Sequence, residues 1–351
     1  MDYKSRILKL HSLIAQASFD AYIVENPIDL FYLTGMEVST GVLVADQESA
    51  FFILDGRYHE TGVAQSPVPV VLLKEDTLKE VITSDLKGVK SLGFAEDITS
   101  FKRAQQLSEI VSTTPSDNLV EALREIKDKQ EIEVLSEAAV LGSKGYDFVL
   151  SLLKEGITEK QVAKELEIFW MQNGGDRLAF DPIIAFGKHT SMPHYRPQPV
   201  PLKKGDPVLI DIGVVFNHYH SDMTRVHFFD GDPSAKMLEI YNVVKIAQEK
   251  ALKLCKPGTT IGDLDAAARS FIKDKGYGEA FSHGLGHGVG LEIHEKPVLR
   301  NKPPYADKVL HEGMVITIEP GIYLPDIGGV RLENTVVITK EGFSDLTKRS
   351  L

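Results

Sequence analysis

Two aspartates eleven residues apart lie in a segment that favours β-structure. Asp211 and Asp222 belong to the run 207–229, which predicts two strands that fold back on each other. A two-residue turn at Phe216-Asn217 would place Asp211 directly opposite Asp222, with their Cβ atoms about 4.5–5.5 Å apart. Two bare carboxylates at that separation would repel and raise each other's pKa unless a cation lay between them. A pair of metal ions about 3.5–4 Å apart would suit the gap.

Two glutamates follow a similar pattern further along the chain. Glu319 and Glu333 are each embedded in a run of β-branched residues, so each is predicted to lie inside a strand. Arg331 shares a strand face with Glu333, and that pair alone is equally compatible with a surface salt bridge on an edge strand. Asp222 alone is likewise compatible with a turn or edge residue. Asp211 is harder to explain in that way, because it interrupts an apolar strand, where an unpaired charge is costly.

Three histidines lie in the glycine-rich segment 283–294. Glycine occupies positions 284, 286, 288 and 290, and each glycine costs a helix about 1 kcal/mol relative to alanine, so an extended chain is predicted. The glycines would share one face, where another backbone or a ligand can approach closely, and His283 and His287 would share the other. A lone histidine is usually a structural residue, but three so close together favour function. Oxygen and nitrogen ligands of these types suit Mn²⁺, Co²⁺ or Zn²⁺.

The elements that must position these residues form two predicted domains. Residues 1–122 alternate helix and strand, which predicts a small α/β domain with a helix over 3–17 and strands at 21–24, 41–45 and 49–54. The composition turns charged over 119–130, and a long helical pattern then runs to about residue 153. The boundary is therefore placed at residue 122, and the second domain comprises residues 123–351.

The second domain contains a weak internal repeat. Lys154-Glu-Gly156-Ile-Thr158 and Lys256-Pro-Gly258-Thr-Thr260 are offset by 102 residues, and each glycine can end one helix while each final threonine caps the next. Strand patterns follow over 179–229 and 283–339. A repeat this short can arise by chance. Taken at face value, it predicts an α+β domain with pseudo-symmetric helix-helix-sheet halves and a cleft between its sheets.

The composition excludes several classes of partner. The net charge is −11 over 351 residues and there is no basic stripe, which argues against nucleic acid. The longest apolar runs have fewer than 10 residues, against about 20 for a membrane span, and Met1–Gln16 carries too many charges for a signal peptide. The single cysteine, Cys255, excludes an internal disulfide and a cysteine-based metal cluster. The expectation is a cytoplasmic protein that binds neither nucleic acid nor membrane.

The three segments together resemble the pita-bread metallopeptidases, a family that includes methionine aminopeptidase, aminopeptidase P and prolidase. Its ligand order is Asp, Asp eleven residues later, His in a glycine-rich run, Glu in an Ile-Glu-Pro-Gly run, and Glu shortly before a β-branched strand. The resemblance implies two divalent metal ions, with Mn²⁺ preferred over Co²⁺ or Zn²⁺. The implied ligands are Asp211, Asp222, His287, Glu319 and Glu333.

The first domain narrows the resemblance within that family. Residues 21–35 and the run Leu54-Asp-Gly-Arg57-Tyr58 resemble the N-terminal domain of aminopeptidase P, prolidase and creatinase, which methionine aminopeptidases generally lack. The fold implied is a pita-bread catalytic domain preceded by a smaller α/β creatinase-like domain. Creatinase needs no metal and lacks the full ligand set, so the complete set argues against it. The sequence departs from the usual family pattern at two places, where Val226 replaces a frequent Thr and His218-Tyr219 replaces Gly-Tyr. Neither place is a ligand position.

The resemblance also implies an activity, the hydrolysis of the bond between an N-terminal residue and proline by a water that two metal ions activate. Met192-Pro-His194-Tyr195 is similar to a Pro-His segment of the family. The residues implied to act on the substrate are His194, His294 and Glu319. The residues implied to shape the proline pocket or to orient the carboxylates are His283, Tyr323 and Arg331.

The preferred prediction is an Xaa-Pro aminopeptidase, which acts on peptides with proline in the second position. The alternative is an Xaa-Pro dipeptidase. A dipeptidase needs a cation near the free carboxylate of the substrate's proline. Some compact prolidases carry arginine directly after the proline that follows the third histidine, and Val298 stands there instead, although Arg300 and Lys302 could substitute. A non-catalytic pita-bread binding protein is the competing class. Analogy with relatives suggests a homodimer.

Overall fold

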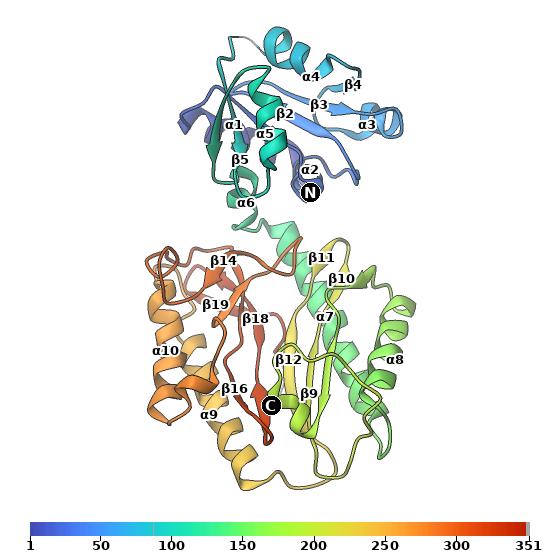
Figure 1. The fold of residues 1–351 in the computed structure, drawn as a ribbon, viewed down its shortest axis with the longest axis vertical. Helices are drawn as coiled ribbons and strands as arrows, with labels where there is room; N and C mark the ends of the chain where they lie inside the picture. Colours follow the sequence, from blue (N-terminus) through green and yellow to red (C-terminus); the bar gives the residue numbers. More distant parts are fainter. Residues whose placement is uncertain (87, 349–351) are drawn as a thin grey trace. The chain divides into compact units, whose positions relative to one another are not determined.

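The computed structural model describes residues 1–86 and 88–348. It divides into two compact units, Met1–Arg124 and Glu125–Leu351, called here the amino-terminal and carboxyl-terminal units (Figure 1). The last three residues of the predicted catalytic domain lie outside the described residues.

The amino-terminal unit is built on a six-stranded sheet in the order β4-β3-β2-β1-β5-β6. Strand β1 pairs with β2 in antiparallel fashion and with β5 in parallel fashion. All of its residues are buried, which is typical of a strand covered on both faces. The strands are β1 (Ala21–Val24), β2 (Val42–Ala45), β3 (Ala50–Leu54), β4 (Val70–Leu72), β5 (Ser91–Ala95) and β6 (Ser112–Ser116). The α-helices are α1 (Tyr3–Gln16), α2 (Pro27–Thr34), α3 (His59–Gln65), α4 (Thr77–Glu80), α5 (Phe101–Ser108) and α6 (Leu119–Arg124).

The first half of the carboxyl-terminal unit begins with two helices, α7 (Lys129–Leu152) and α8 (Glu159–Gln172). Two three-stranded sheets follow, in the orders β11-β10-β7 and β12-β9-β8. Their strands are β7 (Arg177–Leu178), β8 (Ile183–Phe186), β9 (Pro207–Ile212), β10 (Val214–Phe216), β11 (Tyr219–His220) and β12 (Met223–Phe228). A short 3₁₀ helix, η2 (Gly187–Ser191), follows β8.

The second half repeats this plan with α9 (Ala235–Leu252) and α10 (Ile261–Asp274). A five-stranded sheet has the order β14-β13-β15-β18-β19, and a hairpin joins β16 to β17. These strands are β13 (Gly286–Gly288), β14 (Glu295–Leu299), β15 (Val315–Ile318), β16 (Gly321–Leu324), β17 (Gly328–Arg331), β18 (Asn334–Thr339) and β19 (Gly342–Asp345). Within this unit the strands lie between α7 and α8 on one side and α9 and α10 on the other (Figure 1).

The predicted internal repeat corresponds to an equivalent structure in each half. Thr158 and Thr260 are the N-caps of α8 and α10, and the side chain of each accepts a hydrogen bond from the third residue of its helix. Gly156 and Gly258 both have a φ of 86°, a left-handed conformation that favours glycine. The fold prediction of pseudo-symmetric helix-helix-sheet halves is therefore confirmed.

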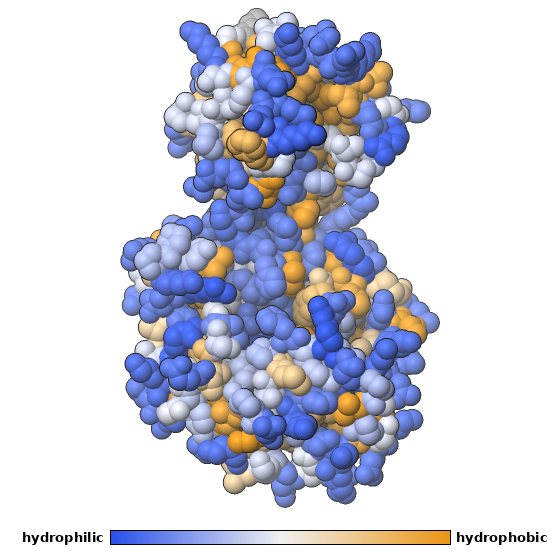
Figure 2. Space-filling view, in the orientation of Figure 1, coloured by the Kyte–Doolittle hydropathy of each residue, from blue (hydrophilic) through white to orange (hydrophobic). Residues whose placement is uncertain are grey.

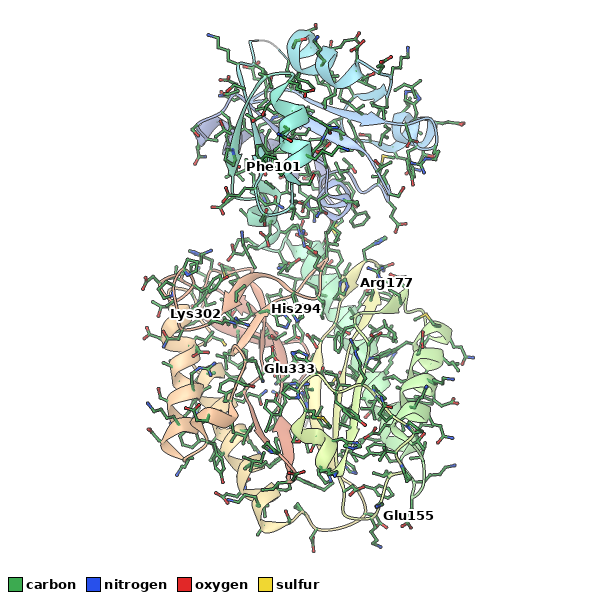
Figure 3. All side chains as sticks on the ribbon, in the orientation of Figure 1. Phe101, Glu155, Arg177, His294, Lys302 and Glu333 are labelled. Atoms are coloured by element: carbon green, nitrogen blue, oxygen red, sulfur yellow. The ribbon has the colours of Figure 1, made fainter. Side chains whose placement is uncertain are left out.

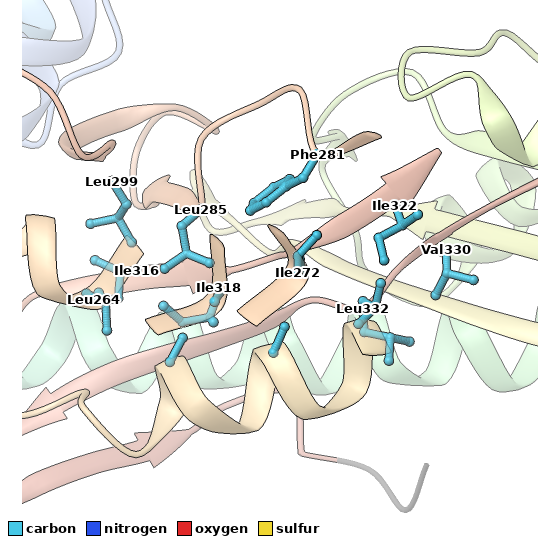
Figure 4. Close-up of a cluster of buried hydrophobic side chains, with 14 of the residues drawn as sticks. Leu264, Ile272, Phe281, Leu285, Leu299, Ile316, Ile318, Ile322, Val330 and Leu332 are labelled. Carbon is cyan, nitrogen blue, oxygen red and sulfur yellow. The ribbon is translucent and has the colours of Figure 1, made fainter. Parts of the chain in front are cut away.

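Each half has its own apolar core between helices and strands. In the second half, Ile272 of α10 and Phe281 pack with Ile316 and Ile318 of β15 and with Val330 of β17 (Figure 4). Hydrophilic residues dominate the visible surface, and hydrophobic residues are scattered over it in small patches (Figure 2). Over residues 1–86 and 88–348, no helix has the length and apolar character that crossing a membrane requires.

The hairpin that follows Asp211 has a register different from the predicted one. Its turn residues are Asn217 and His218, with φ of 47° and 72°, one position later than predicted. A type I′ turn needs positive φ at both central residues, which asparagine tolerates better than phenylalanine does. Strands β9 and β12 consequently pair Asp211 with Thr224, so the predicted pairing of Asp211 with Asp222 is wrong.

Candidate metal centre

A cleft of about 530 Å³ in the carboxyl-terminal unit collects the candidate residues. His294 and Glu333 both lie on the inner side of this unit, among the strands that the helices flank (Figure 3). The candidate residues that line the cleft are His194, Asp211, Asp222, His283, His287, His294, Glu319, Arg331 and Glu333. Tyr323, the remaining candidate, hydrogen-bonds to two of them.

Three of the four carboxylates lie where the chain passes from one sheet to another. Asp222 lies between β11 and β12, Glu319 between β15 and β16, and Glu333 between β17 and β18, and in each case the two strands belong to different sheets. Only Asp211 lies inside a strand, so the prediction that Glu319 and Glu333 lie within strands is wrong. Pro320 contributes to the break after Glu319, because proline has no N–H to donate to a ladder.

The carboxylates and one imidazole converge at distances that suit a metal ion. One ligand atom each from Asp222, His287 and Glu333 lies within 4.8 Å of the others. Nε2 of His287 lies 3.6 Å from Oδ2 of Asp222 and 3.5 Å from Oε1 of Glu319. Bonds of about 2.0–2.2 Å place two ligands of one ion roughly 3–4 Å apart. The separations therefore fit shared coordination.

His287 is oriented as a ligand must be. Its Nδ1 lies 3.0 Å from the carbonyl oxygen of Gly288, so an Nδ1–H donated there leaves the Nε2 lone pair directed at the carboxylates. Burial, assisted by nearby His294, lowers the pKa of His287 to about 4, which keeps the ring neutral at pH 7. The pairing register with β14 shifts between His287 and Gly288.

The negative charges of the clustered carboxylates repel one another. Burial and the charges of neighbouring carboxylates raise the pKa of Asp222 and of Glu319 well above their ordinary values. Burial, with the charge of Asp211, raises the pKa of Glu333 to about 7. A divalent cation at this point would offset the repulsion, and the oxygen and nitrogen donors match hard or borderline ions. The residues present therefore fit a divalent metal site.

This arrangement predicts an unusual stability change in protein stripped of metal with EDTA. With its raised pKa, folded Glu333 keeps a proton that the unfolded chain loses near pH 4.5, so its charge destabilises the fold as the pH rises towards 7. Glu333→Gln, which mimics the protonated acid, should gain about 2–3 kcal/mol over the wild type between pH 5 and pH 8. Urea unfolding of both stripped proteins measures this difference, and the histidine contributions cancel.

The effect of added metal separates this prediction from simple damage to the fold. Excess Mn²⁺ should stabilise the wild type more than Glu333→Gln, because only the wild type keeps all the candidate ligands. Equal stabilities of the two stripped proteins at pH 8 would contradict the buried charge at Glu333.

Arg331 and Tyr323 link the carboxylates to His283. The guanidinium of Arg331 donates to Oδ2 of Asp211 and, at 2.7 Å, to the hydroxyl of Tyr323. That hydroxyl lies 2.8 Å from Nε2 of His283. Burial and the charge of Arg331 lower the pKa of His283 to about 3, so the ring stays neutral. Burial raises the pKa of Tyr323 to about 12, which keeps its hydroxyl protonated.

His194 and His294 reach the cleft from outside this buried network. Both side chains are exposed. The ring of His294 packs edge-on against His287, with centroids 4.3 Å apart and an interplanar angle of 79°. Burial and the charge of His194 lower the pKa of His294. The two histidines therefore face the same space from different segments of the chain.

Two threonines that support the carboxylates were missed in the sequence. Oγ1 of Thr224 donates to Glu333 at 2.7 Å and accepts from Nε of Arg331 at 3.2 Å. Oγ1 of Thr317 accepts from the backbone N–H of His287 at 3.1 Å. Each threonine stands two residues from a ligand candidate, Asp222 or Glu319, so the strand period of two could have indicated both.

A second cleft, of about 370 Å³, lies in the amino-terminal unit beside the ends of β1 and β5. Its two carboxylates already have cationic partners, because Glu25 lies 2.7 Å from Arg103 and Asp29 lies 2.8 Å from Arg124. Its lining includes no histidine or cysteine among the described residues. Of these two clefts, the larger one therefore offers the metal-ligand side chains.

Two family matches cover most of the chain. Residues 133–340 match Metallopeptidase family M24, and residues 6–126 match the Creatinase/Prolidase N-terminal domain.

Named relatives match along nearly the whole length. An Xaa-Pro dipeptidase of Pyrococcus furiosus is 38% identical over 351 residues, which cover 98% of each chain. The solved structure of an Xaa-Pro dipeptidase from Bacillus anthracis is 36% identical, with a TM-score of 0.93 over 99% of this chain and 98% of that one. An X-Pro aminopeptidase from Thermotoga maritima is 32% identical, with a TM-score of 0.86 over 96% and 97% of the two chains.

Proposed function

The chain belongs to metallopeptidase family M24, and on that premise we propose that it is an Xaa-Pro dipeptidase that hydrolyses peptides of two residues ending in proline. The family makes it a peptide hydrolase. The dipeptidase names of two relatives with 36–38% identity support the narrower activity. The aminopeptidase that the sequence alone favoured has less support, and the Thermotoga maritima structure keeps it as the second candidate.

The proposed ligand residues are those that converge in the larger cleft: Asp211, Asp222, His287, Glu319 and Glu333. Two divalent ions bound there would supply Lewis-acid activation of a water molecule and of the peptide carbonyl. Glu319 would take a proton from the attacking water and deliver it to the departing proline nitrogen. His294 and His194 would donate hydrogen bonds to the carbonyl oxygen as negative charge develops on it.

The position of Arg300 is the observation that carries the dipeptidase proposal. The free carboxylate of a dipeptide needs a cation in the cleft. Three arginines line it. Arg331 is bound to Asp211, and Arg196 pairs with Asp181 at 2.8 Å. Within residues 1–86 and 88–348, Arg300 makes no side-chain ion pair, so its guanidinium is available to a substrate carboxylate.

Arg300 also lies beside the proposed proline pocket. Its Cγ and Nε lie 3.0 Å and 3.2 Å from the place that a Cβ of residue 284 would occupy, so the side chain packs against Gly284, next to His283. Val298 lines the same cleft. Lys302, the other basic candidate, is not among the lining residues and lies well apart from His294 and Glu333 (Figure 3).

Substrate length and metal content test the proposal together. Purified protein should contain about two divalent ions per chain, with Mn²⁺ as the proposed ion, and should hydrolyse Ala-Pro at least about tenfold better than Ala-Pro-Ala in kcat/KM. A preference for Ala-Pro-Ala would establish the aminopeptidase instead. A metal-free protein that stays inert with Mn²⁺ would indicate a binding protein. A homodimer is proposed on analogy with relatives, and a cytoplasmic location on the composition of the sequence.

Arg300→Ala should reduce kcat/KM for Ala-Pro by about 10- to 100-fold, because a hydrogen-bonded charge pair contributes roughly 1.5–3 kcal/mol. The effect on Ala-Pro-NH₂, which lacks the free carboxylate, should be less than about threefold. Lys302→Ala, an exposed basic residue two positions away, is the matched control and should match the wild type. Equal losses on both substrates would show that Arg300 does not bind the carboxylate.

A further inference from the structure

Helix α8 begins with a carboxylate, Glu159, that is fully buried at 0% exposure. We propose that Glu159 is a positioning residue, which holds the segment carrying His194 in place at the cleft. The inference rests on the role in hydrolysis that the proposed function gives to His194. Glu159 itself would not contact the substrate.

Glu159 binds one segment of the chain through both of its carboxylate oxygens. Oε1 accepts from the backbone N–H of Phe186 at 2.8 Å and lies 3.1 Å from Nδ1 of His189. Oε2 accepts from the hydroxyl of Tyr195 at 2.7 Å and from the backbone N–H of Gln198 at 3.0 Å. Every one of these partners belongs to residues 186–198, the segment in which His194 lies.

His194 depends on those anchors for its position. It is exposed and lies beyond η2, in a stretch without helix or strand. The ring of its sequence neighbour Tyr195 lies tilted against that of His189, with centroids 4.7 Å apart, and the Tyr195 hydroxyl lies 2.9 Å from Nδ1 of His189. Glu159 contacts both rings, so it fixes the backbone on each side of His194.

The second half of the unit shows that the fold itself does not need a carboxylate at this position. The residue equivalent to Glu159, 102 positions later, is Ile261, which is fully buried in an apolar core. The backbone bonds around the two residues correspond. The N–H of Glu159 donates to the carbonyl of Val200 at 3.2 Å, and the N–H of Ile261 donates to that of Lys308 at 2.8 Å.

The same correspondence holds three residues before each helix begins. Gly156 N–H donates to the carbonyl of Leu202 and Gly258 N–H to that of Leu310, both at 2.9 Å. An aliphatic side chain is therefore enough to form the start of this helix when the residue has only a structural role. A buried carboxylate is costly unless its oxygens are satisfied. In the first half the partners that satisfy Glu159 are the ones that flank His194, which points to a function for the charge.

Glu159→Gln tests the proposal with little change in shape. The new amide presents N–H groups where one oxygen accepted hydrogen bonds, so the backbone anchor on that side, the N–H of Phe186 or of Gln198, is lost. We expect kcat for Ala-Pro to fall about 10- to 100-fold while KM changes less than about threefold, because small misplacements of a reacting geometry have effects of that size. Hydrogen exchange should accelerate in residues 186–198 and stay unchanged in residues 300–311.

Two comparisons separate positioning from lost stability. Ile261→Val, the matched change in the second half, should lower stability by about 1 kcal/mol without lowering kcat. In a His194→Ala background, Glu159→Gln should lower kcat less than about twofold further, since the residue that it positions is gone. If the double variant instead shows a decrease in kcat equal to the product of the two single decreases, the proposal is overturned. An unchanged kcat in Glu159→Gln would also overturn it.

The inference and the proposed function fail in different ways. A wild-type protein that hydrolyses no Xaa-Pro peptide would remove the proposed function. The hydrogen-exchange comparison would then still decide whether Glu159 holds the segment, and unchanged exchange over residues 186–198 would overturn that too.

Discussion

Glu333→Ala should lower kcat/KM for Ala-Pro by at least about a thousandfold and should remove at least one bound metal ion per chain. Glu333 is 2% exposed, its Oε2 accepts from Thr224, and it belongs to the convergent group with Asp222 and His287. Losing several kcal/mol of coordination and charge stabilisation reduces a rate tenfold for each 1.4 kcal/mol. Elemental analysis after dialysis and steady-state kinetics with Mn²⁺ measure the two effects.

The control for this substitution is Glu341→Ala, which removes an exposed glutamate eight positions later. It should keep both the metal and the turnover of the wild type. Full Mn²⁺-dependent turnover in Glu333→Ala would exclude Glu333 from the site.

His294→Ala should keep the metal ions and lower kcat by roughly 10²- to 10³-fold. The side chain lines the cleft but lies outside the convergent group of ligand atoms, and it contacts the edge of His287. A donor that acts only once the carbonyl oxygen becomes negative contributes to the transition state, and removal of one such donor has effects of that size. Kinetics and elemental analysis on one preparation separate the two quantities.

His311→Ala replaces an exposed histidine outside the cleft and should leave kcat unchanged. If His294→Ala instead loses metal, His294 is a ligand and the proposed assignment of the histidines is wrong.

Much of the fold could be predicted from local sequence signals. The caps at Thr158 and Thr260 indicated the two halves, because hydroxyl caps and left-handed glycines act within a few residues of the chain. The prediction of the hairpin register was wrong for a related reason. It depends on which two residues accept positive φ, and a shift of the turn by one position moves the partner of Asp211 from Asp222 to Thr224.

The site was less predictable where it depends on tertiary structure. Periodicity indicated that Glu319 and Glu333 belong to β-rich runs, but only the sheet order shows that the chain changes sheets at each of them. The choice between Arg300 and Lys302 depends on which side chain lines the cleft, and their spacing in sequence carries no such information. Glu159 lies in the first turn of a helix, a position that favours carboxylates for local reasons, so its type and place in the sequence do not indicate its buried contacts with residues 186–198.

The candidate ligands are divided between the two pseudo-symmetric halves. Asp211 and Asp222 come from the first half, and His287, Glu319 and Glu333 come from the second. Neither half alone offers enough donors for a pair of ions, so an isolated half would be catalytically incompetent even if it folded. Local opening of either half would also break the shared coordination sphere. A pair of ions held by these candidate ligands would therefore couple the two halves into one cooperative unit, although each has its own apolar core.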